Sequence, residues 1–245
     1  IGYASLEANT TGRFNTALGA DSLKTLNGSD SCTAIGYGAL GANTGQNNTA
    51  VGRDSLISNT TGYNNIGVGF ESLKANTTGL YNTGIGWRAM YTHSSGNNNT
   101  AIGNDSQPST TSISNEITLG DSSVTNLRCN DTSISTLSDE RDKTNIVDIP
   151  LGLDFINTLR PVSFDWDRRD GSMDGKKDFG FIAQELKVAQ DATSYATSMR
   201  LVHEDNPDKL EADPMKTYPM LVKAIQELST MIETLQSEVA TLKGT

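Results

Sequence analysis

The repeat unit reads Thr49-Ala50-Val51-Gly52-Arg53-Asp54-Ser55-Leu56-Ile57-Ser58-Asn59-Thr60-Thr61-Gly62-Tyr63-Asn64-Asn65, and variants of it fill the first half of the chain. An aliphatic residue followed by glycine marks each copy, at Ile1-Gly2, Leu18-Gly19, Ile35-Gly36, Val51-Gly52, Val68-Gly69, Ile85-Gly86, Ile102-Gly103 and Leu119-Gly120. Successive copies are 17 residues apart, except for one step of 16. One short unit cannot bury its own apolar face, so it must stack on its copies. The sequence therefore predicts a repetitive rod.

The pattern within each unit predicts how the rod is built. The residue before the aliphatic position is always small: Ala17, Ala34, Ala50, Gly67, Gly84 or Ala101. This suits a crowded axis where backbones approach closely. The aliphatic residue and the following leucine are five positions apart, so both can point inward only if the chain turns at the intervening glycine. Segments such as Asn59-Thr60-Thr61-Gly62 are expected to supply turns with positive φ.

Each unit is thus predicted to be one coil of a β-solenoid or β-roll, which makes the first half a mainly β rod. Hydrophobic residues make up only 35% of the chain and aromatic residues 6%, so one coil offers little apolar mass. We therefore expect three chains to share one core, as a homotrimer. A small α+β domain and a long coiled-coil helix are expected to follow the rod.

Composition excludes several partners. The formal net charge of −10 argues against nucleic acid, which requires clustered Lys and Arg. No stretch reaches the roughly 18 apolar residues of a membrane span, so no membrane insertion is expected. No acidic spacing matches a calcium loop, so no metal is predicted. Cys32 and Cys129 lie several coils apart and are expected to be small buried residues rather than a disulfide. Because the chain opens within a repeat at Ile1, we expect a fragment of a longer protein.

Charge divides the chain into two halves. Residues 1–137 contain 6 Lys and Arg and 9 Asp and Glu, whereas residues 138–245 contain 13 and 20. We expect a rod over 1–130, a junction over 131–137, an α+β domain over 138–216 and a C-terminal helix over 217–243. Within the α+β domain, a short helix over 151–159 and a strand over 162–166 are expected before the segment Asp178 to Leu186.

The C-terminal helix carries a heptad pattern. Its a positions are Tyr218, Ile225, Ile232 and Val239, and its d positions are Leu221, Leu228, Leu235 and Leu242. Four heptads of this kind predict a coiled coil. β-Branched residues at a with leucine at d favour two strands in parallel coils. We nevertheless expect three, because the adjoining rod requires three chains. Thr217 is a candidate N-cap and Gly244 a candidate stop.

Three ordered motifs resemble a known family. They are Ser138-Asp139-x-Arg141-x-Lys143-x-x-Ile146, Gly180-Phe181-Ile182-Ala183-Gln184-Glu185, and Lys223-Ala224-Ile225-Gln226-Glu227-Leu228. Together they span about residues 136–243 and resemble the intramolecular chaperone domain of phage tail spikes and fibres, the peptidase S74 family. The resemblance implies that the domain assembles three fibre chains in register and, in many members, then cleaves itself free.

Carried over to this sequence, the family's cleavage implies Leu137–Ser138 as the scissile bond. Ser138 would be the nucleophile and Lys143 its general base, with no cofactor. A serine hydroxyl becomes a strong nucleophile only when a neighbour takes its proton. The sequence departs from the family at Asp142, where an apolar residue is common, and a carboxylate there favours the charged form of the lysine. The alternative is a solvated junction loop without chemistry.

The resemblance implies the distal part of a phage tail fibre or spike, made in the host cytoplasm and assembled into the virion. Expected partners are two further copies of the chain, other virion tail proteins and a host cell-surface receptor, which could be a glycan. A bacterial trimeric surface adhesin head is the alternative. Tyr3, Tyr37, Phe70 and Trp87 share one repeat position. They are expected either to pack between chains or to form a stripe on which sugars stack.

Overall fold

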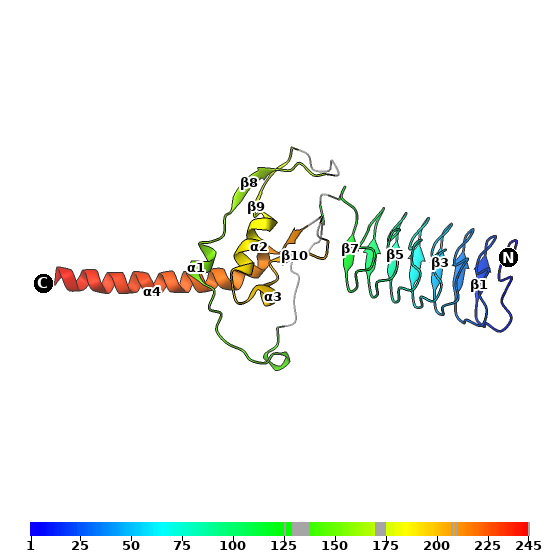
Figure 1. The fold of residues 1–245 in the computed structure, drawn as a ribbon, viewed down its shortest axis with the longest axis horizontal. Helices are drawn as coiled ribbons and strands as arrows, with labels where there is room; N and C mark the ends of the chain where they lie inside the picture. The colour runs from blue at the N-terminus through cyan, green and yellow to red at the C-terminus, as the bar shows by residue number, and fades with distance from the viewer. Residues whose placement is uncertain (125, 129–137, 170–174, 207, 209, 245) are drawn as a thin grey trace. The chain divides into compact units, whose positions relative to one another are not determined.

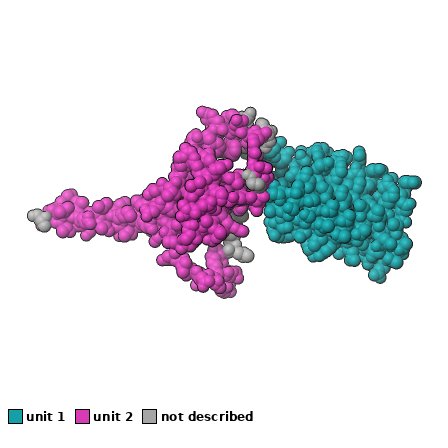
Figure 2. Space-filling view, in the orientation of Figure 1, with its two compact units in different colours: residues 1–126 teal, residues 127–245 magenta. Residues whose placement is uncertain are grey.

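The computed structural model describes residues 1–124, 126–128, 138–169, 175–206, 208 and 210–244. These residues form two compact units, Ile1–Asn126 and Leu127–Thr245 (Figure 2). The predicted junction 131–137 and Cys129 lie outside the described residues. Each unit is described by itself.

The first unit is a parallel β-solenoid of about six turns, which confirms the predicted fold of the repeats. Its strands are β1 (Thr16–Leu18), β2 (Thr33–Ile35), β3 (Thr49–Val51), β4 (Ile66–Val68), β5 (Thr83–Ile85), β6 (Thr100–Ile102) and β7 (Ile117–Leu119). They pair in sequence order to form one sheet, in which equivalent residues lie opposite one another (Figure 1). The 16-residue step leaves this register unchanged, because Thr33 pairs with Thr49.

The interior of the solenoid holds two kinds of apolar residue. The central residue of each strand points inward, and Ala34, Ala50 and Ala101 are fully buried. The small side chains predicted for a crowded axis are thus confirmed at these positions. Leucine or methionine fills the rest of the core, at Leu23, Leu40, Leu56, Leu73 and Met90. These residues adopt φ between 49° and 54°, a left-handed conformation that costs about 1–2 kcal/mol for a non-glycine residue. Full burial of a leucine, worth about 1.5–3 kcal/mol, offsets that cost. Because these side chains are fully buried within one chain, the expectation that three chains share this core is wrong.

The aliphatic residue that precedes the strand glycine does not share this core. The expectation that it points inward is wrong, because Leu18, Ile35, Ile85 and Ile102 are 37–47% exposed. Each strand has only three residues, and side chains alternate between faces. The inward central position therefore forces both flanking positions outward. An aliphatic stripe consequently runs along the outside of the sheet.

Two glycine rows let the coils stack. Gly69 adopts φ +134°, and a Cβ there would lie 2.1 Å from the carbonyl oxygen of Gly86 in the next coil. Gly62, in the Asn-Thr-Thr-Gly turn, is not at positive φ, so that expectation is wrong. It is needed because a Cβ would meet the Gly79 carbonyl oxygen at 2.5 Å. Two residues after this glycine, Asn64 adopts positive φ.

Buried asparagines form two ladders along the solenoid. In one ladder, the Asn59 amide donates to Asn43 Oδ1 at 2.6 Å and to the Gly62 carbonyl at 2.8 Å. The second ladder runs through Asn48, Asn65, Asn82 and Asn99. Its side-chain oxygens accept the backbone N–H of the next member at 2.9–3.0 Å. Ladders of this kind satisfy backbone groups inside the rod, where an unpaired polar group is costly.

Three buried residues, Leu26, Cys32 and His93, stand at asparagine positions of the ladders. Cys32 replaces an asparagine in the second ladder and is buried and free. Burial raises the pKa of its thiol, as desolvation outweighs the hydrogen bonds that favour the thiolate. His93 replaces an asparagine in the first ladder and is also fully buried. Its Nε2 lies 3.1 Å from the Gly96 carbonyl oxygen, whereas its Nδ1 and Asn76 Oδ1 have no partner among the described residues.

The second unit is a small α+β module with a long terminal helix (Figure 1). Its helices are η1 (Glu140–Asp142), α1 (Leu153–Ile156), α2 (Ala183–Asp191), α3 (Ala196–Met199), η2 (Pro214–Thr217) and α4 (Tyr218–Lys243). Its strands are β8 (Val162–Asp165) and β9 (Lys177–Gly180), which form one antiparallel pair, and β10 (Val202–His203) and β11 (Glu211–Ala212), which form another. The predicted helix over 151–159 is shorter than expected, and the predicted strand ends one residue early.

One compact core holds this unit together. Phe155, Leu186, Met199, Leu201, Val202 and Met220 are its buried members. Met220 and Ala224 lie in the first turns of α4, so only the start of that helix packs against its own chain. Thr217 directly precedes α4, as predicted, but its side chain makes no capping hydrogen bond to the helix. A 3₁₀ turn precedes the helix, and the Thr217 hydroxyl instead donates to the Pro214 carbonyl at 2.6 Å.

Candidate functional site

A single tight turn builds the predicted serine–lysine site. Asp139 is the N-cap of η1, and its carboxylate accepts the backbone N–H of Arg141 at 2.9 Å. The Lys143 N–H donates to the Glu140 carbonyl at 3.1 Å and closes the turn. An N-cap of this kind satisfies a backbone donor that the first turn of a helix leaves free. The turn therefore folds residues 138 and 143 back toward one another.

Ser138 and Lys143 are in direct contact. Lys143 Nζ donates to Ser138 Oγ at 2.7 Å and to the Ser138 carbonyl oxygen at 3.2 Å. The structure thus brings together the two residues that the sequence singled out. A lysine within hydrogen-bonding distance of a serine hydroxyl satisfies the geometric requirement for a nucleophile and its base. Both side chains are exposed. The bond that they would cleave joins Ser138 to Leu137, which lies outside the described residues.

An ion pair between Arg141 and Asp139 also stabilises the turn. Arg141 donates from Nε to Asp139 Oδ1 at 3.0 Å and from Nη2 to Oδ2 at 2.6 Å. The Arg141 side chain, followed by its backbone N–H, lowers the pKa of the Asp139 carboxyl below its ordinary value. The same contact raises the pKa of Arg141. Asp142 belongs to η1, and within the described residues it forms no ion pair with Lys143.

Sequence reasoning missed the role of Asp139. It identified the serine and the lysine by resemblance, yet the residue that caps the turn between them was treated only as part of a motif. An aspartate immediately before a short helical turn is a recognised N-cap signal, so the role could have been predicted. The paired role of Arg141 had no comparable signal, because surface ion pairs are not determined by spacing alone.

The other two motifs serve the framework of the module. In the second motif, Glu185 accepts hydrogen bonds from Arg160 Nε at 2.9 Å and Nη2 at 2.5 Å. In the third motif, Glu227 accepts the backbone N–H of Leu153 at 2.7 Å and caps α1 from α4. A Cβ on Gly152 would lie 2.3 Å from that carboxylate, so a larger residue there would displace the Glu227 side chain. The Glu227 contact ties the start of α4 to α1, and the Arg160–Glu185 pair ties the segment after α1 to α2.

The comparison with known families falls on this unit. Residues 138–194 match Peptidase_S74, the chaperone of endosialidase family. The match begins at Ser138 itself and covers the first two motifs, whereas the third motif and the repeats lie outside it. It covers less than a quarter of the chain. No curated protein and no solved structure matches the chain. The match and the solenoid together support an intramolecular chaperone of the tail-fibre type.

A second candidate surface lies along α4. All eight a and d residues predicted from the heptads are exposed, from 39% for Leu221 to 75% for Leu242. The start of the helix uses its other side, at Met220 and Ala224, to pack against its own module. A continuous apolar seam of this length on one chain is the surface that coiled-coil partners cover.

In the described part of the chain, no group of three or more His, Cys, Asp or Glu side chains is placed to hold a metal ion. Among the described helices, none combines the length and apolarity that crossing a membrane requires.

Proposed function

We propose that the chain is the distal part of a phage tail fibre or spike, in which residues 138–243 act as an intramolecular chaperone that assembles three copies of the rod. The observation that carries this proposal is the exposed heptad seam of α4, attached to a module that matches the chaperone family. A bacterial adhesin head would share the trimeric rod, and the family match favours the fibre.

The rod creates the need for such a chaperone. Its coils are nearly equivalent, so three chains aligned by the repeats alone can slip by one coil at little cost. Parallel β structure also forms slowly and leaves unpaired edges exposed during assembly. A C-terminal coiled coil that associates first raises the local concentration of the rods and sets their register. The rod then forms from β7 toward β1.

Oligomeric mass tests this proposal. The full chain carrying Ser138→Ala, which keeps the polypeptide intact, should have three times the monomer mass by light scattering. Ile225→Asp, in the exposed seam, should convert it to monomer or aggregate, because an unpaired charge would be buried in the coiled coil. Ser229→Asp, on the same helix outside the a and d positions, is the matched control and should leave the trimer intact. A monomeric, folded parent chain would refute the proposal.

Truncation tests the chaperone role separately. Deleting residues 138–245 before expression should yield insoluble or wrongly aligned rod. Removing the same residues after assembly, by cleavage at an engineered protease site, should leave the rod soluble. Soluble trimeric rod from the first experiment would show that the C-terminal unit is dispensable for assembly.

A second activity is supported by the 2.7 Å contact between Lys143 and Ser138. We propose that the chain cleaves itself before Ser138. Ser138 Oγ attacks the carbonyl carbon of residue 137, forming an ester as the peptide C–N bond breaks. Lys143, as the neutral amine, accepts the hydroxyl proton and returns it to the departing amino group of Ser138. Water then hydrolyses the ester, which leaves a carboxylate on residue 137 and restores the serine hydroxyl.

A denaturing gel tests self-cleavage. Assembled protein should give two fragments, with Ser138 as the new N-terminus by mass spectrometry. Ser138→Ala and Lys143→Met should each give one full-length band, whereas Lys176→Met, a lysine elsewhere in the unit, should cleave normally. A single full-length band from the assembled parent chain would exclude the activity and leave the chaperone proposal to be judged by oligomeric mass.

The remaining partners follow from the same proposal. As part of a virion, the rod would connect to other tail proteins and present its surface to a host receptor. Both roles are supported by the family match and by the exposed residues of the solenoid, and purification of the chain with intact virions would test them.

A further inference from the structure

One edge of the solenoid carries a stack of rings and guanidinium groups. Phe70 and Trp87 follow the strand glycine in successive coils, and their rings are parallel within 9°, with centroids 6.3 Å apart. Arg53, in the preceding coil, places its Cζ 5.5 Å from the centroid of Phe70. Arg88 Cζ lies 5.0 Å from the centroid of Trp87. We call Arg53, Phe70, Glu71, Trp87, Arg88 and Asp105 the aromatic edge.

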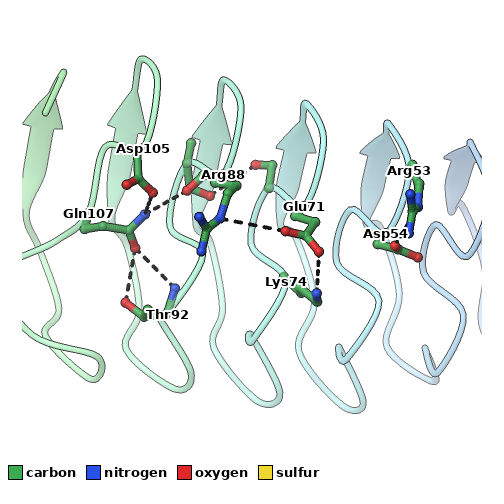
Figure 3. A network of polar contacts seen from close by, with 10 residues as sticks. Arg53, Asp54, Glu71, Lys74, Arg88, Thr92, Asp105 and Gln107 are labelled. Carbon is green, nitrogen blue, oxygen red and sulfur yellow. Dashed lines mark hydrogen bonds and ion pairs between the residues drawn. The ribbon is translucent and has the colours of Figure 1, made fainter.

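Charged side chains along the aromatic edge are held in place by their neighbours (Figure 3). Arg88 Nε lies 3.7 Å from Glu71 Oε2, and Glu71 also pairs with Lys74. Gln107 donates to Asp105 Oδ1 at 3.3 Å and to the Arg88 carbonyl oxygen at 2.7 Å. Side chains fixed in this way lose little conformational entropy when they bind a ligand. The aromatic edge is therefore preorganised.

The aromatic edge also has an accessible ring. The Arg88 guanidinium rests on the Tyr91 ring, with Cζ 3.8 Å from the ring centroid. Its Nε is buried and pairs with Glu71, so that atom is not open to a ligand. Trp87 is 46% exposed although it is a large aromatic residue. The next coil has the small polar residue Asn104 at the Trp87 position, so the ring stack ends there.

We propose that the aromatic edge binds a neutral, linear glycan that runs along the axis of the solenoid. This inference rests on the proposed role in host attachment and names its ligand class. A sugar ring presents a flat C–H face that stacks on Trp87, and its hydroxyl groups both donate and accept hydrogen bonds. Arg88 and Arg53 supply donors, and Glu71 and Asp105 supply acceptors.

Spacing and charge select this ligand. Coils that pair through parallel strands repeat every ~4.8 Å, a distance comparable to one sugar ring. Successive sugars of an extended chain can therefore meet equivalent positions of successive coils. The cations Arg53, Lys74 and Arg88 are balanced by the carboxylates Asp54, Glu71 and Asp105 (Figure 3). With no excess of positive charge here, and −10 on the whole chain, a polyanion is disfavoured.

Binding of the full chain to an array of oligosaccharides tests the proposal. The array carries neutral linear oligomers of glucose, galactose and N-acetylglucosamine, with sialylated and sulfated oligomers as anionic comparators. We expect binding to at least one neutral oligomer. Trp87→Ala should weaken it about tenfold or more, equivalent to about 1.4 kcal/mol. Tyr81→Ala removes an equally exposed ring from the segment before the strand, and it should change affinity less than about twofold.

Light scattering on the same variants separates this inference from the proposed function. A trimer that binds no neutral oligomer, or binds one equally well after Trp87→Ala, overturns the glycan site and leaves the fibre proposal standing. Preference for the anionic oligomers overturns the neutral ligand. If Trp87→Ala lowers the oligomeric mass, the aromatic edge is a contact between chains, and the glycan site is likewise overturned.

Discussion

Lys143 Nζ lies 2.7 Å from Ser138 Oγ, in a contact that one capped turn of the chain creates by itself. The geometry of a nucleophile and its base is therefore present in a single polypeptide. Neither residue is buried, however, because both are exposed in the single chain. Desolvation is one of the factors that favour the neutral, proton-accepting form of a lysine. The contact is in place, while the environment that would activate it is missing.

Self-cleavage should consequently depend on assembly. We expect Ile225→Asp, which disrupts the α4 seam, to slow cleavage at least about tenfold although it lies far along the sequence from the bond; this corresponds to about 1.4 kcal/mol of lost activation. The measurement is fragment yield against time on a denaturing gel, with Ser229→Asp as control. Equal cleavage by a monomeric Ile225→Asp chain would show that the turn alone is sufficient.

Asp139 should position the serine–lysine pair through its cap and its ion pair. Asp139→Ala removes both, and we expect cleavage to slow about tenfold or more, whereas Asp139→Asn keeps a cap acceptor and should recover part of the rate. Because the pKa of Asp139 is lowered, its contribution is complete above the ordinary carboxyl pKa of about 3.9 and is lost only as pH falls through the lowered value. The rate profile of the parent chain should therefore show no loss from this group at pH 5. If Asp139 had a purely structural role, the Asp139→Ala variant would be less soluble, but its folded fraction would cleave itself at the parental rate.

His93→Asn should stabilise the rod. The asparagine supplies an amide donor for Asn76 Oδ1 and removes His93 Nδ1. Both of these atoms are buried and have no hydrogen-bond partner among the described residues. We expect the free energy of unfolding to rise by about 1–2 kcal/mol, measured by chemical denaturation. Asn59→His introduces the same interruption elsewhere in the ladder and should lower stability by a similar amount. A destabilised His93→Asn variant would contradict this reading of the ladder.

Gly69→Ala should be severely destabilising. Its Cβ would lie 2.1 Å from the Gly86 carbonyl oxygen and would also occupy a strained φ. We expect a loss of about 3 kcal/mol or more by thermal unfolding. Gly28→Ala provides the comparison, because its φ is +81° but the nearest atom to its Cβ is 3.4 Å away. A similar, small loss in both variants would show that backbone strain, rather than contact between coils, dominates.

The core and the outer stripe should respond differently to truncation. Leu73→Ala empties a fully buried site and should cost about 2–5 kcal/mol. Ile85→Ala acts on a residue that is 39% exposed in the single chain and should cost less than about 1 kcal/mol there. In the assembled protein, a much larger cost for Ile85→Ala would show that other chains cover the stripe. Differential scanning calorimetry of the assembled and seam-disrupted proteins measures both.

The repeat period determined the solenoid from sequence because stacking is the only way that units such as Thr49–Asn65 can bury apolar area. Which side chains point inward was harder to predict from the sequence. Leu56 was correctly placed inside, yet Val51 was expected beside it and lies at the outer edge of β3. The difference arises because each strand is only three residues long, which the pattern of apolar residues does not reveal.

The residues of the candidate site could be predicted from the sequence, but their arrangement in space could not. Ser138 and Lys143 could be named by resemblance, and nothing in their spacing showed that the chain folds them into contact. That contact depends on Asp139 and on the turn it caps. The exposed seam of α4 was fully predictable, because apolar residues at a and d positions, such as Ile225 and Leu228, specify which side of the helix needs a partner.

The shortened coil between β2 and β3 shows where the rod tolerates change. Its corner reads Asn43-Thr44-Gly45 in place of Asn59-Thr60-Thr61-Gly62, yet Asn43 still reaches the glycine carbonyl, at 2.7 Å. Strand pairing on both sides is undisturbed. This corner therefore accommodates the loss of one residue without shifting the strands on either side. A peptide grafted there would be displayed at a fixed height on the rod while the scaffold stays the same.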